Sequence, residues 1–537
     1  MTEELSLVIT GGRVIDGTGV PWYYADIGLA GDRIAAVAKA RPGEESPLSG
    51  RAQAVLDARG LVVAPGFIDA HSHSDLTVLL NPTADAKIMQ GVTTEVIAQC
   101  GTSPAPHTDA TAAQAETMLK ARGQDLKVDW RTFGQYAAKV EAQGVSLNVA
   151  GLVGHGTVRI AAMGYEARRP TADELAKMCR LVAEAMDDGV FGFSTGLIYV
   201  PGSYSDTDEV VALARVAAER GGAYFTHMRS EGRGLFESVA EAVRVGREAG
   251  MPVQISHLKS AGPAQGQSGR LIETIEAARA GGVEVTADQY PYTAGSTGLS
   301  ALLPPWVHQG GPEAMKQRLL DPATRARIRA DMQGTVPGWE NDFGTVPFSS
   351  VLISSCPDQS LEGRNVQEIA DARGKDPYDT VFDTLGQISL GTHTVIHLMD
   401  EKDVRAIMGQ EFVMVGSDAS CVSARLGGKP HPRSYGTFVR TLGRYVREEK
   451  VLTLSQAVRK MTGFPAAKLG LQDRGLIRRG FYADLALFDP DTVADTATYA
   501  EPHRFPVGVK HVIVNGALTV EDGRHTGAKA GRVLRRP

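Results

Sequence analysis

The chain has 537 residues, of which 43% are hydrophobic and 22% are charged, and its formal net charge at pH 7 is -6. This composition is typical of a globular protein rather than of a disordered or membrane protein. The acidic balance provides no broad basic surface for nucleic acid or anionic lipid, so chemistry on small molecules is the expected kind of function.

The first residues are acidic and polar, without the basic start and long apolar stretch of a signal peptide. No other stretch has the length and apolar character of a membrane span. The cysteines lack the paired spacing of a disulfide framework or a zinc finger: Cys100, Cys179, Cys356 and Cys421. These features predict a cytoplasmic protein.

The two ends of the chain share one sequence pattern. Residues 7–63 consist of short β-type runs broken by Gly-Gly, Gly-Asp and Arg-Gly turn signals, and the same pattern returns in GLIRRGFYADLALFDP and VKHVIVNGALTVEDGRHTG. We therefore predict a small discontinuous β-sandwich domain made of residues 1–64 and 465–537.

Between these ends, apolar runs alternate with helical patterns that close on glycine, as in 173–189, 208–222 and 235–250. Such βα repetition predicts a parallel sheet, and eight strand candidates suit a (β/α)8 barrel over residues 65–464. The candidates are Gly66–His73, Thr93–Cys100, Ser146–Leu152, Val190–Ser194, Ala223–His227, Pro252–His257, Val283–Asp288 and Glu411–Asp418.

A long stretch separates the last two of these candidates. It contains a helical pattern and then the apolar runs VLISS and TVIHLM. Because a structureless loop of that length is improbable, we predict a helical, lid-like insertion over 297–350 at the mouth of the barrel, followed by returning elements of the seventh strand. If either apolar run is itself a barrel strand, one of the eight candidates is not.

His71 and His73 are two residues apart at the end of the first strand candidate, so both imidazoles point to one face. In a barrel that face is the interior at the catalytic mouth. A single histidine in a strand is usually a core or surface residue, but two at this spacing, followed by Ser-Asp, favour a metal site.

Three further strand candidates end in residues that ligate zinc. VIAQC ends in Cys100, whose thiolate is a strong soft ligand, and YFTH and VQISH end in His227 and His257. Each residue alone has a structural explanation, and a buried inert cysteine is the common case. Their joint position at the predicted mouth favours a metal site, whereas the other cysteines are interpreted as structural.

The last strand candidate, FVMVGSD, ends in Asp418. A water activated by zinc must lose a proton, and the leaving group must gain one, so a carboxylate at the mouth fits a proton-transfer role. The alternative is an aspartate that caps the following turn.

Taken together, these segments resemble the N-acyl-D-amino-acid deacylases, or D-aminoacylases, of the amidohydrolase superfamily, over nearly the whole chain. The histidine pair and the aspartate are typical of the superfamily, whereas the cysteine motif, LVGHG, STGLIY and the tail are typical of the deacylases. The matching segments are APGFIDAHSHSD, GVTTEVIAQCGTSPAP, LVGHGTVR, FGFSTGLIYVPG, YFTHMRSEG, ISHLKSAG, DQYPYTAGST, VGSDAS, HPRSYGTF, GLIRRGFYADLALFDP and VNGALTVEDGRHTGAKAGRVLRR.

The resemblance implies a tightly held Zn2+ on Cys100, His227 and His257, and a second, weaker or empty position formed by His71, His73 and Asp418. In this family the thiolate replaces the carbamylated lysine of hydantoinases and dihydroorotases. In agreement, the fourth strand reads VFGFSTGL and contains neither lysine nor glutamate. One departure is Gln99, which precedes Cys100 where the family often has asparagine.

For the substrate, the family pattern implies that Lys259 and Tyr290 hold the carboxylate of the amino acid, through charge-assisted bonds about twice as strong as neutral ones. Ser296 and His155 are further candidates for the pocket, and their structural alternatives are a turn serine and a hydrogen-bonded loop histidine. The segment TAGSTGLSALLPPW is apolar and contains no arginine. It therefore favours neutral or hydrophobic D-side chains over D-Glu or D-Asp.

The predicted reaction is zinc-dependent hydrolysis of N-acyl-D-amino acids, with Asp418 as general base and acid. Two alternatives from the same barrel are a cyclic-amide (hydantoinase-like) hydrolase and a D-dipeptide hydrolase. A non-catalytic scaffold that keeps the barrel is a third, although such proteins usually lose metal ligands, and all six are present here.

Overall fold

A ring of parallel strands forms the centre of the computed structural model, which describes residues 4–40, 44, 46–121, 123–334, 336, 339, 341 and 344–536. Each of the eight strand candidates overlaps a strand of this ring, so the predicted barrel is confirmed. In ring order these strands are β7 (Phe67–Asp69), β8 (Val92–Ile97), β9 (Asn148–Gly151) with β10 (Val153–Gly154), β11 (Gly192–Gly196), β12 (Ala223–His227), β13 (Val253–Ile255), β14 (Val285–Gln289) and β18 (Val413–Val415).

Backbone hydrogen bonds close the ring where the strands themselves are short. The amide of Asp418 donates to the carbonyl of His71 at 2.8 Å, and a parallel bridge joins Ser72 to Ala419. On the far side, the amide of Phe191 donates to the carbonyl of Gly151 at 2.8 Å. The carboxyl ends of the strands therefore meet at one mouth.

Helices cover the outside of the barrel, because each buries one apolar stripe against the strands. In α8, Leu235, Val239, Ala242 and Val243 are buried, and the helix is capped by Gly250, whose φ of 69° suits glycine. The outer helices are α4 (Phe133–Gln143), α5 (His155–Met163), α6 (Ala172–Asp187), α7 (Thr207–Ala218), α8 (Leu235–Ala249), α9 (Ser268–Ala280), α14 (Glu401–Met408), α15 (Arg433–Arg440), α16 (Leu454–Met461) and α17 (Gly463–Lys468). Two short helices, α1 (Thr77–Leu80) and α2 (Asp85–Ile88), lie between β7 and β8 in the chain, and the longer α3 (Asp109–Ala121) lies between β8 and β9.

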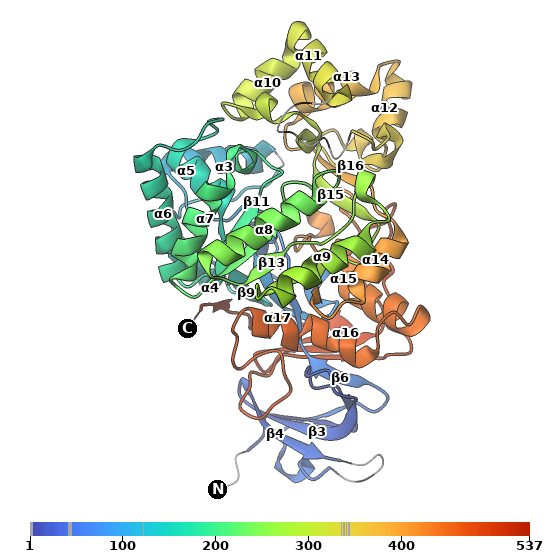
Figure 1. Ribbon diagram of the computed structural model, residues 1–537. Coiled ribbons are helices and arrows are strands. Elements are labelled where there is room, and N and C mark those ends of the chain that lie inside the picture. The colour runs from blue at the N-terminus through green and yellow to red at the C-terminus, as the bar shows by residue number, and fades with distance from the viewer. Residues whose placement is uncertain are drawn as a thin grey trace.

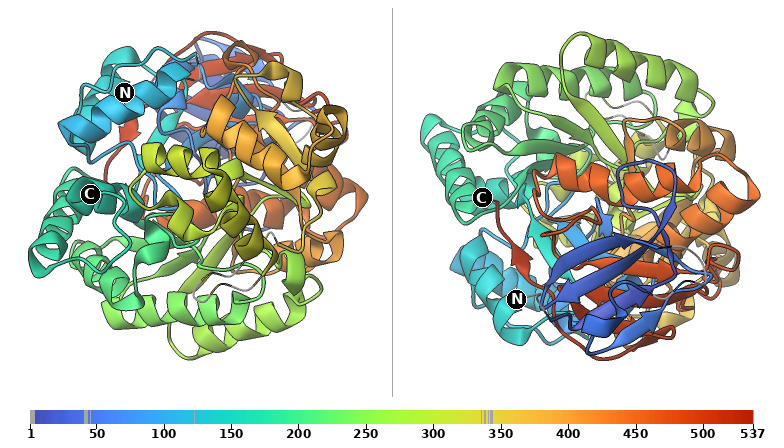
Figure 2. Two further views of the ribbon diagram at one scale, coloured as in Figure 1. Left: turned by 90° about the horizontal axis from the view of Figure 1, so that it is seen from above. Right: turned by 90° about the horizontal axis from the view of Figure 1, so that it is seen from below.

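The insertion after β14 has its own sheet and core. VLISS is β16 and TVIHLM begins in β17, and both belong to an antiparallel sheet outside the barrel because their apolar faces pack against the helices of the insertion. The insertion lies over the mouth (Figures 1 and 2), and its elements continue past residue 350. They are β15 (Ala294–Gly298), α10 (Pro312–Leu320), α11 (Pro322–Gln333), β16 (Val351–Ser355), α12 (Val366–Arg373), α13 (Pro377–Asp383) and β17 (His393–His397).

Both ends of the chain pair at the opposite end of the barrel, as predicted (Figure 2, right). Strand β6 lies antiparallel to β19, and a separate small core packs beneath them. The strands are β1 (Leu7–Thr10), β2 (Arg13–Val14), β3 (Tyr23–Ala30), β4 (Arg33–Lys39), β5 (Val55–Asp57), β6 (Val62–Pro65), β19 (Leu485–Phe488), β20 (Val509–Val514), β21 (Ala517–Glu521) and β22 (Arg524–His525). The last strand, β23 (Val533–Leu534), instead joins β9 in the barrel wall.

The domain boundaries at 64/65 and 464/465 stay predictions. Parts of the predicted ranges 1–64, 297–350 and 465–537 lie outside the described residues: 1–3, 41–43, 45, 335, 337–338, 340, 342–343 and 537. Within the described part of the chain, no helix is long and apolar enough to cross a membrane.

Candidate metal centre

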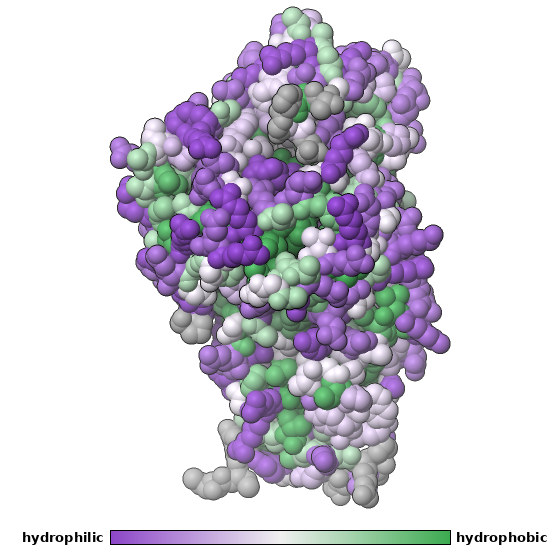
Figure 3. Space-filling view, in the orientation of Figure 1, coloured by the Kyte–Doolittle hydropathy of each residue, from purple (hydrophilic) through white to green (hydrophobic). Residues whose placement is uncertain are grey.

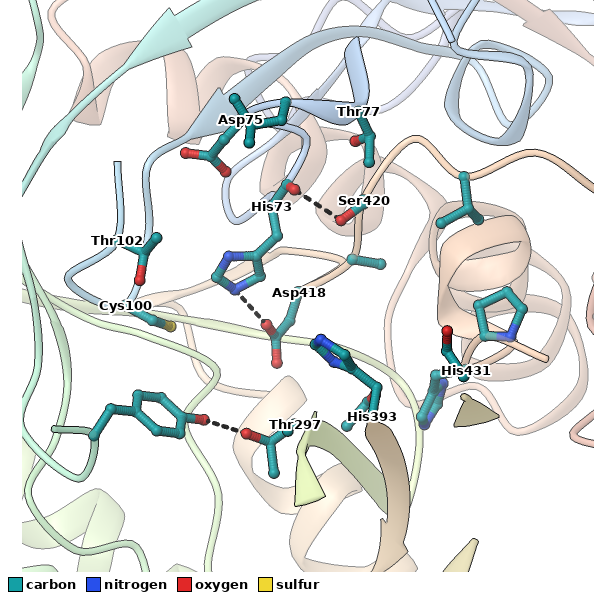
Figure 4. A pocket seen from close by; sticks show the side chains of 18 of the residues that line it. His73, Asp75, Thr77, Cys100, Thr102, Thr297, His393, Asp418, Ser420 and His431 are labelled. Carbon is teal, nitrogen blue, oxygen red and sulfur yellow. Dashed lines mark hydrogen bonds and ion pairs between the residues drawn. The ribbon is translucent and has the colours of Figure 1, made fainter. Parts of the chain in front are cut away.

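Six side chains converge at the mouth of the barrel, each at or just beyond the end of a strand. His71 and His73 follow β7, Cys100 follows β8, His227 ends β12, His257 follows β13 and Asp418 follows β18. Figure 4 shows Cys100, His73 and Asp418 pointing into the same cavity.

Three of these residues have left-handed backbone conformations, with φ of 53° at Cys100, 37° at His257 and 51° at Asp418. This conformation is costly for residues with a side chain and is retained mainly at functional sites. It turns each side chain from the end of its strand towards the centre of the mouth.

Cys100, His227 and His257 form one cluster of possible ligands. The Cys100 Sγ lies 3.4 Å from His257 Nε2, and that nitrogen lies 2.9 Å from His227 Nδ1. Burial lowers the pKa of both histidines, that of His227 well below its usual range, so both imidazoles are neutral and able to ligate a metal.

His71, His73, Cys100 and Asp418 form a second cluster. The Asp418 Oδ1 lies 3.0 Å from His73 Nε2 and 3.6 Å from His71 Nε2, while the Cys100 Sγ lies 3.4 Å from His71 Nε2. Cys100 is thus common to both clusters, in a position where one thiolate is able to contact two metal ions.

The donor set fits zinc, which prefers nitrogen and sulfur ligands in compact sites. Burial, and then the charge of Asp418, raise the pKa of the Cys100 thiol well above its usual range. A bound cation reverses that shift, because a ligating thiol is deprotonated by the metal. The pair of clusters therefore has the chemistry of a metal centre with two adjacent positions.

Two buried carboxylates, which the sequence interpretation missed, orient the histidines from behind. The Asp288 Oδ1 lies 3.1 Å from His71 Nδ1 and accepts the amide of His257 at 2.8 Å. The Glu231 Oε1 lies 2.9 Å from His257 Nδ1. Such partners fix the orientation of metal ligands and raise their basicity. Asp288 and Glu231 lie in DQYPYTAGST and YFTHMRSEG, two of the segments that resemble the deacylase family, and this position was the signal that could have identified them.

Gln99, the departure before Cys100, does not contact the sulfur in the described hydrogen bonds. Its amide donates to the carbonyl of Ala70 at 3.0 Å and so ties the end of β8 to the end of β7. The side chain therefore supports the backbone on which Cys100 and His71 lie.

The candidate substrate residues separate into two groups. Lys259, Tyr290 and Ser296 line the cavity around the metal centre. The Lys259 Nζ donates to Glu231 and lies 2.6 Å from His257 Nδ1. His155 is fully buried and is not part of that lining; its Nε2 lies 2.8 Å from Glu209, which fits the alternative of a structural histidine.

Arg433 is a further residue of the mouth to which the sequence interpretation gave no role. It is 3% exposed, its Nη1 lies 2.8 Å from Asp418 Oδ2, and its guanidinium lies 4.5 Å from the centre of the Tyr290 ring. Burial alone would raise the pKa of Asp418, but Arg433 and then His257 hold it well below its usual range. The quoted segment HPRSYGTF contained this arginine without indicating its partner.

The cavity that these residues line has a volume of about 760 Å³, within the range of small-molecule sites. Its wall includes His393 at the start of β17, so the insertion contributes to the site (Figure 4). On the face of the molecule seen in Figure 3, hydrophilic residues predominate and hydrophobic areas lie between them.

Comparison with known proteins identifies the family of the chain. The chain matches the model of the amidohydrolase family over residues 54–520. It is 38% identical over 536 residues to a D-aminoacylase of Alcaligenes xylosoxydans xylosoxydans, covering 100% of this chain and 98% of the relative. It is 39% identical over 540 residues to an N-acyl-D-glutamate deacylase of the same organism, with the same coverage.

A solved structure of the N-acyl-D-glutamate deacylase of Bordetella bronchiseptica, complexed with zinc and a phosphonate inhibitor that mimics the tetrahedral intermediate, has a TM-score of 0.81 and 37% identity. The match covers 99% of this chain and all of that one. The chain therefore belongs to the amidohydrolase family and, within it, to the D-aminoacylase family.

Proposed function

We propose that this metal-dependent N-acyl-D-amino-acid deacylase acts on substrates with neutral or hydrophobic side chains, with Zn2+ on Cys100, His227 and His257 and with Asp418 as general base and acid. The observation that carries the proposal is one cavity in which a cysteine–histidine donor set, a carboxylate and a carboxylate-binding pair converge.

The metal positions are proposed to differ in strength. Cys100, His227 and His257 would hold the first zinc ion tightly, because sulfur and neutral imidazole are its preferred ligands. His71, His73 and Asp418 would hold a second ion weakly, since Asp418 is also paired with Arg433. A bound zinc ion supplies Lewis-acid polarisation of the amide carbonyl and lowers the pKa of water.

Asp418 is the proposed proton carrier. Because Arg433 and His257 hold its pKa low, the carboxylate is ionised at neutral pH and able to accept the proton of the attacking water. It then delivers a proton to the amide nitrogen, which leaves as the free amine, while the acyl group leaves as a carboxylate.

Lys259, Tyr290 and Arg433 are proposed to bind the α-carboxylate of the substrate. All three are buried on the side of the mouth that follows β13, β14 and β18. With the carboxylate held there and the scissile carbonyl at the metal centre, a substrate of one configuration presents its side chain to the pocket. This arrangement supports selectivity for one enantiomer.

The proposed preference for neutral side chains rests on the cations of the cavity. Among the described lining residues, the lysine and arginine side chains are Lys259 and Arg433, which are already paired with Glu231 and Asp418. A second substrate carboxylate would need a further cation, since burying an unpaired charge is costly. The insertion instead contributes Ile396 and Leu398 to the lining.

A substrate panel tests this function. We expect the zinc-loaded enzyme to hydrolyse N-acetyl-D-leucine and N-acetyl-D-methionine at least about 100-fold faster, in kcat/KM, than their L-enantiomers and N-acetyl-D-glutamate. Preference for N-acetyl-D-glutamate would refute the side-chain proposal. Activity on hydantoins alone would instead support a cyclic-amide hydrolase, and activity on D-dipeptides alone would support a D-dipeptide hydrolase.

Metal analysis tests the ligand assignment. After dialysis we expect about one zinc ion per chain in the wild type, and loss of that ion in Cys100→Ala and His257→Ala. Cys179→Ala is the matched control, because Cys179 lies on α6, outside both ligand clusters. Stoichiometric zinc in Cys100→Ala would show that the thiolate is not a ligand.

A further inference from the structure

The cavity extends beyond the metal centre on the side away from Lys259, Tyr290 and Arg433. The lining there comes from residues that follow β7, β8 and β10, whereas the carboxylate-binding residues follow β13, β14 and β18. Loops after β10 and β14 lie across the ring of strands from each other. One cavity therefore joins two different walls through the metal centre.

This second wall contains a group of apolar residues: Leu76, Pro104, Ala115, Met118, Leu119 and Ile160. Uncharged polar side chains, mainly threonine and glutamine, also line this side, as do Asp75 and His107. Among the described lining residues that follow β7, β8 and β10, none is lysine, arginine or glutamate. We name this group of six residues the apolar wall.

Helix α3 provides the largest part of the apolar wall. Thr111, Gln114, Ala115 and Met118 have helical spacing and line the cavity along one face of the helix. Met118 is 43% exposed although it is a large apolar residue. A methionine at such a position offers a flexible surface that adapts to apolar ligands.

The base of the apolar wall is rigid. The indole of Trp130, which is 1% exposed, donates to the carbonyl of Pro104 at 2.7 Å. The amide of Ser103 donates to Thr157 at 2.9 Å, and the hydroxyl of Ser103 accepts the amide of Gly154 at 3.0 Å. These bonds fix the loop after β8 to α5 and β10, so the wall is formed before a ligand arrives.

The geometry of an amide decides what reaches this wall. A secondary amide is planar and trans, so the acyl chain leaves the carbonyl on the side opposite the α-carbon of the amino acid. With the α-carboxylate at Lys259 and the carbonyl at the metal centre, the acyl chain extends across the mouth towards α3. An acetyl group ends near the metal, and only a longer chain contacts the apolar wall.

We propose that the apolar wall is an acyl subsite and that the substrates of this enzyme carry an extended, uncharged aliphatic acyl chain rather than acetyl. This inference rests on the proposed function, because the direction of the acyl chain follows from the carboxylate and metal positions. The apolar lining makes each buried methylene favourable, at roughly fourfold in kcat/KM.

A chain-length series tests the acyl subsite. We expect kcat/KM to rise from N-acetyl- through N-butanoyl- and N-hexanoyl- to N-octanoyl-D-leucine, by at least about 30-fold in total. If acetyl-D-leucine is hydrolysed and longer chains are no better, the acyl subsite is refuted while the deacylase function stands. If no acyl-D-amino acid of any length is hydrolysed by the zinc-loaded enzyme, the proposed function is refuted, and the subsite with it.

Two phenylalanine substitutions in α3 test whether the long acyl chain binds at the apolar wall. Ala115→Phe fills the cavity, so the ratio of octanoyl to acetyl kcat/KM should fall at least about tenfold. Ala113→Phe adds the same side chain at an exposed position outside the cavity lining and should leave both rates unchanged. An unchanged ratio in Ala115→Phe would contradict the proposal.

Inhibition by the acyl product gives a second measurement that does not depend on turnover of long substrates. Octanoate should inhibit hydrolysis of N-acetyl-D-leucine with an inhibition constant at least about 30-fold lower than that of acetate, and Ala115→Phe should reduce this difference. Equal inhibition by the two carboxylates would overturn the subsite even if both variants fold poorly.

Discussion

The two walls of the cavity are proposed to bind the substrate by different interactions. The charged wall, which consists of Lys259, Tyr290 and Arg433, offers ionic and hydrogen-bonding contacts, and the apolar wall offers apolar contacts. Lys259, Tyr290 and Arg433 are 6%, 2% and 3% exposed, and Lys259 and Arg433 are paired with buried carboxylates, whereas Met118 on the apolar wall is 43% exposed. A buried paired charge fixes direction and is intolerant of change, while apolar area is graded and tolerant. We therefore expect substitutions at the charged wall to lower kcat/KM strongly and substitutions at the apolar wall to lower it only slightly.

The largest effect is expected at Asp418, where the charged wall meets the metal centre. Asp418→Asn removes the proton acceptor but keeps the size of the side chain, so kcat should fall about 10³-fold. Steady-state kinetics and zinc analysis of the same sample check this. Near-normal turnover would contradict the assigned role, and loss of the first zinc ion would show that Asp418 acts chiefly as a ligand.

Lys259→Met should lower kcat/KM about 100-fold, because a buried charge that meets the substrate carboxylate is lost. The variant also removes the lysine beside Glu231, which orients His257, so zinc analysis and Lys259→Arg, which keeps a cation there, serve as controls. If Lys259→Met keeps its zinc and its thermal midpoint but loses kcat/KM, the lysine binds substrate. Loss of zinc or of the thermal midpoint in proportion to kcat/KM would make its role structural.

On the apolar wall, Met118→Ser should lower kcat/KM for N-octanoyl-D-leucine by only about fivefold, since a partly exposed side chain loses part of its apolar contact. The comparison is sharpened by testing this variant beside Lys259→Met on one substrate. A loss on the scale of the lysine variant would contradict the contrast between the two walls.

The smallest effect concerns the support of the apolar wall. Glu209 on α7 pairs with Arg159 and His155 of α5, the helix that also carries Ile160. Burial would raise the pKa of Glu209, but His155 and Arg159 outweigh burial and lower it. The pair therefore stabilises the fold above about pH 4.3, the value of an unfolded glutamate, and this contribution is lost as pH falls further.

Glu209→Gln should remove this pH-dependent part of the stability. Thermal midpoints measured from about pH 6 down to about pH 3 should fall less steeply below about pH 4.3 in the variant than in the wild type, although the variant is less stable at pH 6. Parallel curves would mean that Glu209 has an ordinary pKa.

The sequence alone was sufficient to predict the barrel and the convergence of six candidate metal ligands at its mouth. The reason is that strand periodicity and strand order are local signals, and the carboxyl ends of parallel strands meet at one mouth whatever the packing. Thus the spacing of His71 and His73, and the terminal positions of Cys100, His227, His257 and Asp418, sufficed to predict that they converge.

Contacts between distant segments were decided only by the tertiary structure. Cys100 is shared by two donor clusters, Arg433 pairs with Asp418, and His155 is held by Glu209 instead of lining the cavity. The sequence predicted VLISS and TVIHLM as returning elements outside the barrel but left a barrel strand open for either, and the pairing of β17 with both β15 and β16 decided this. Pairing partners depend on which faces are buried together, and one apolar run by itself contains no information about its neighbour.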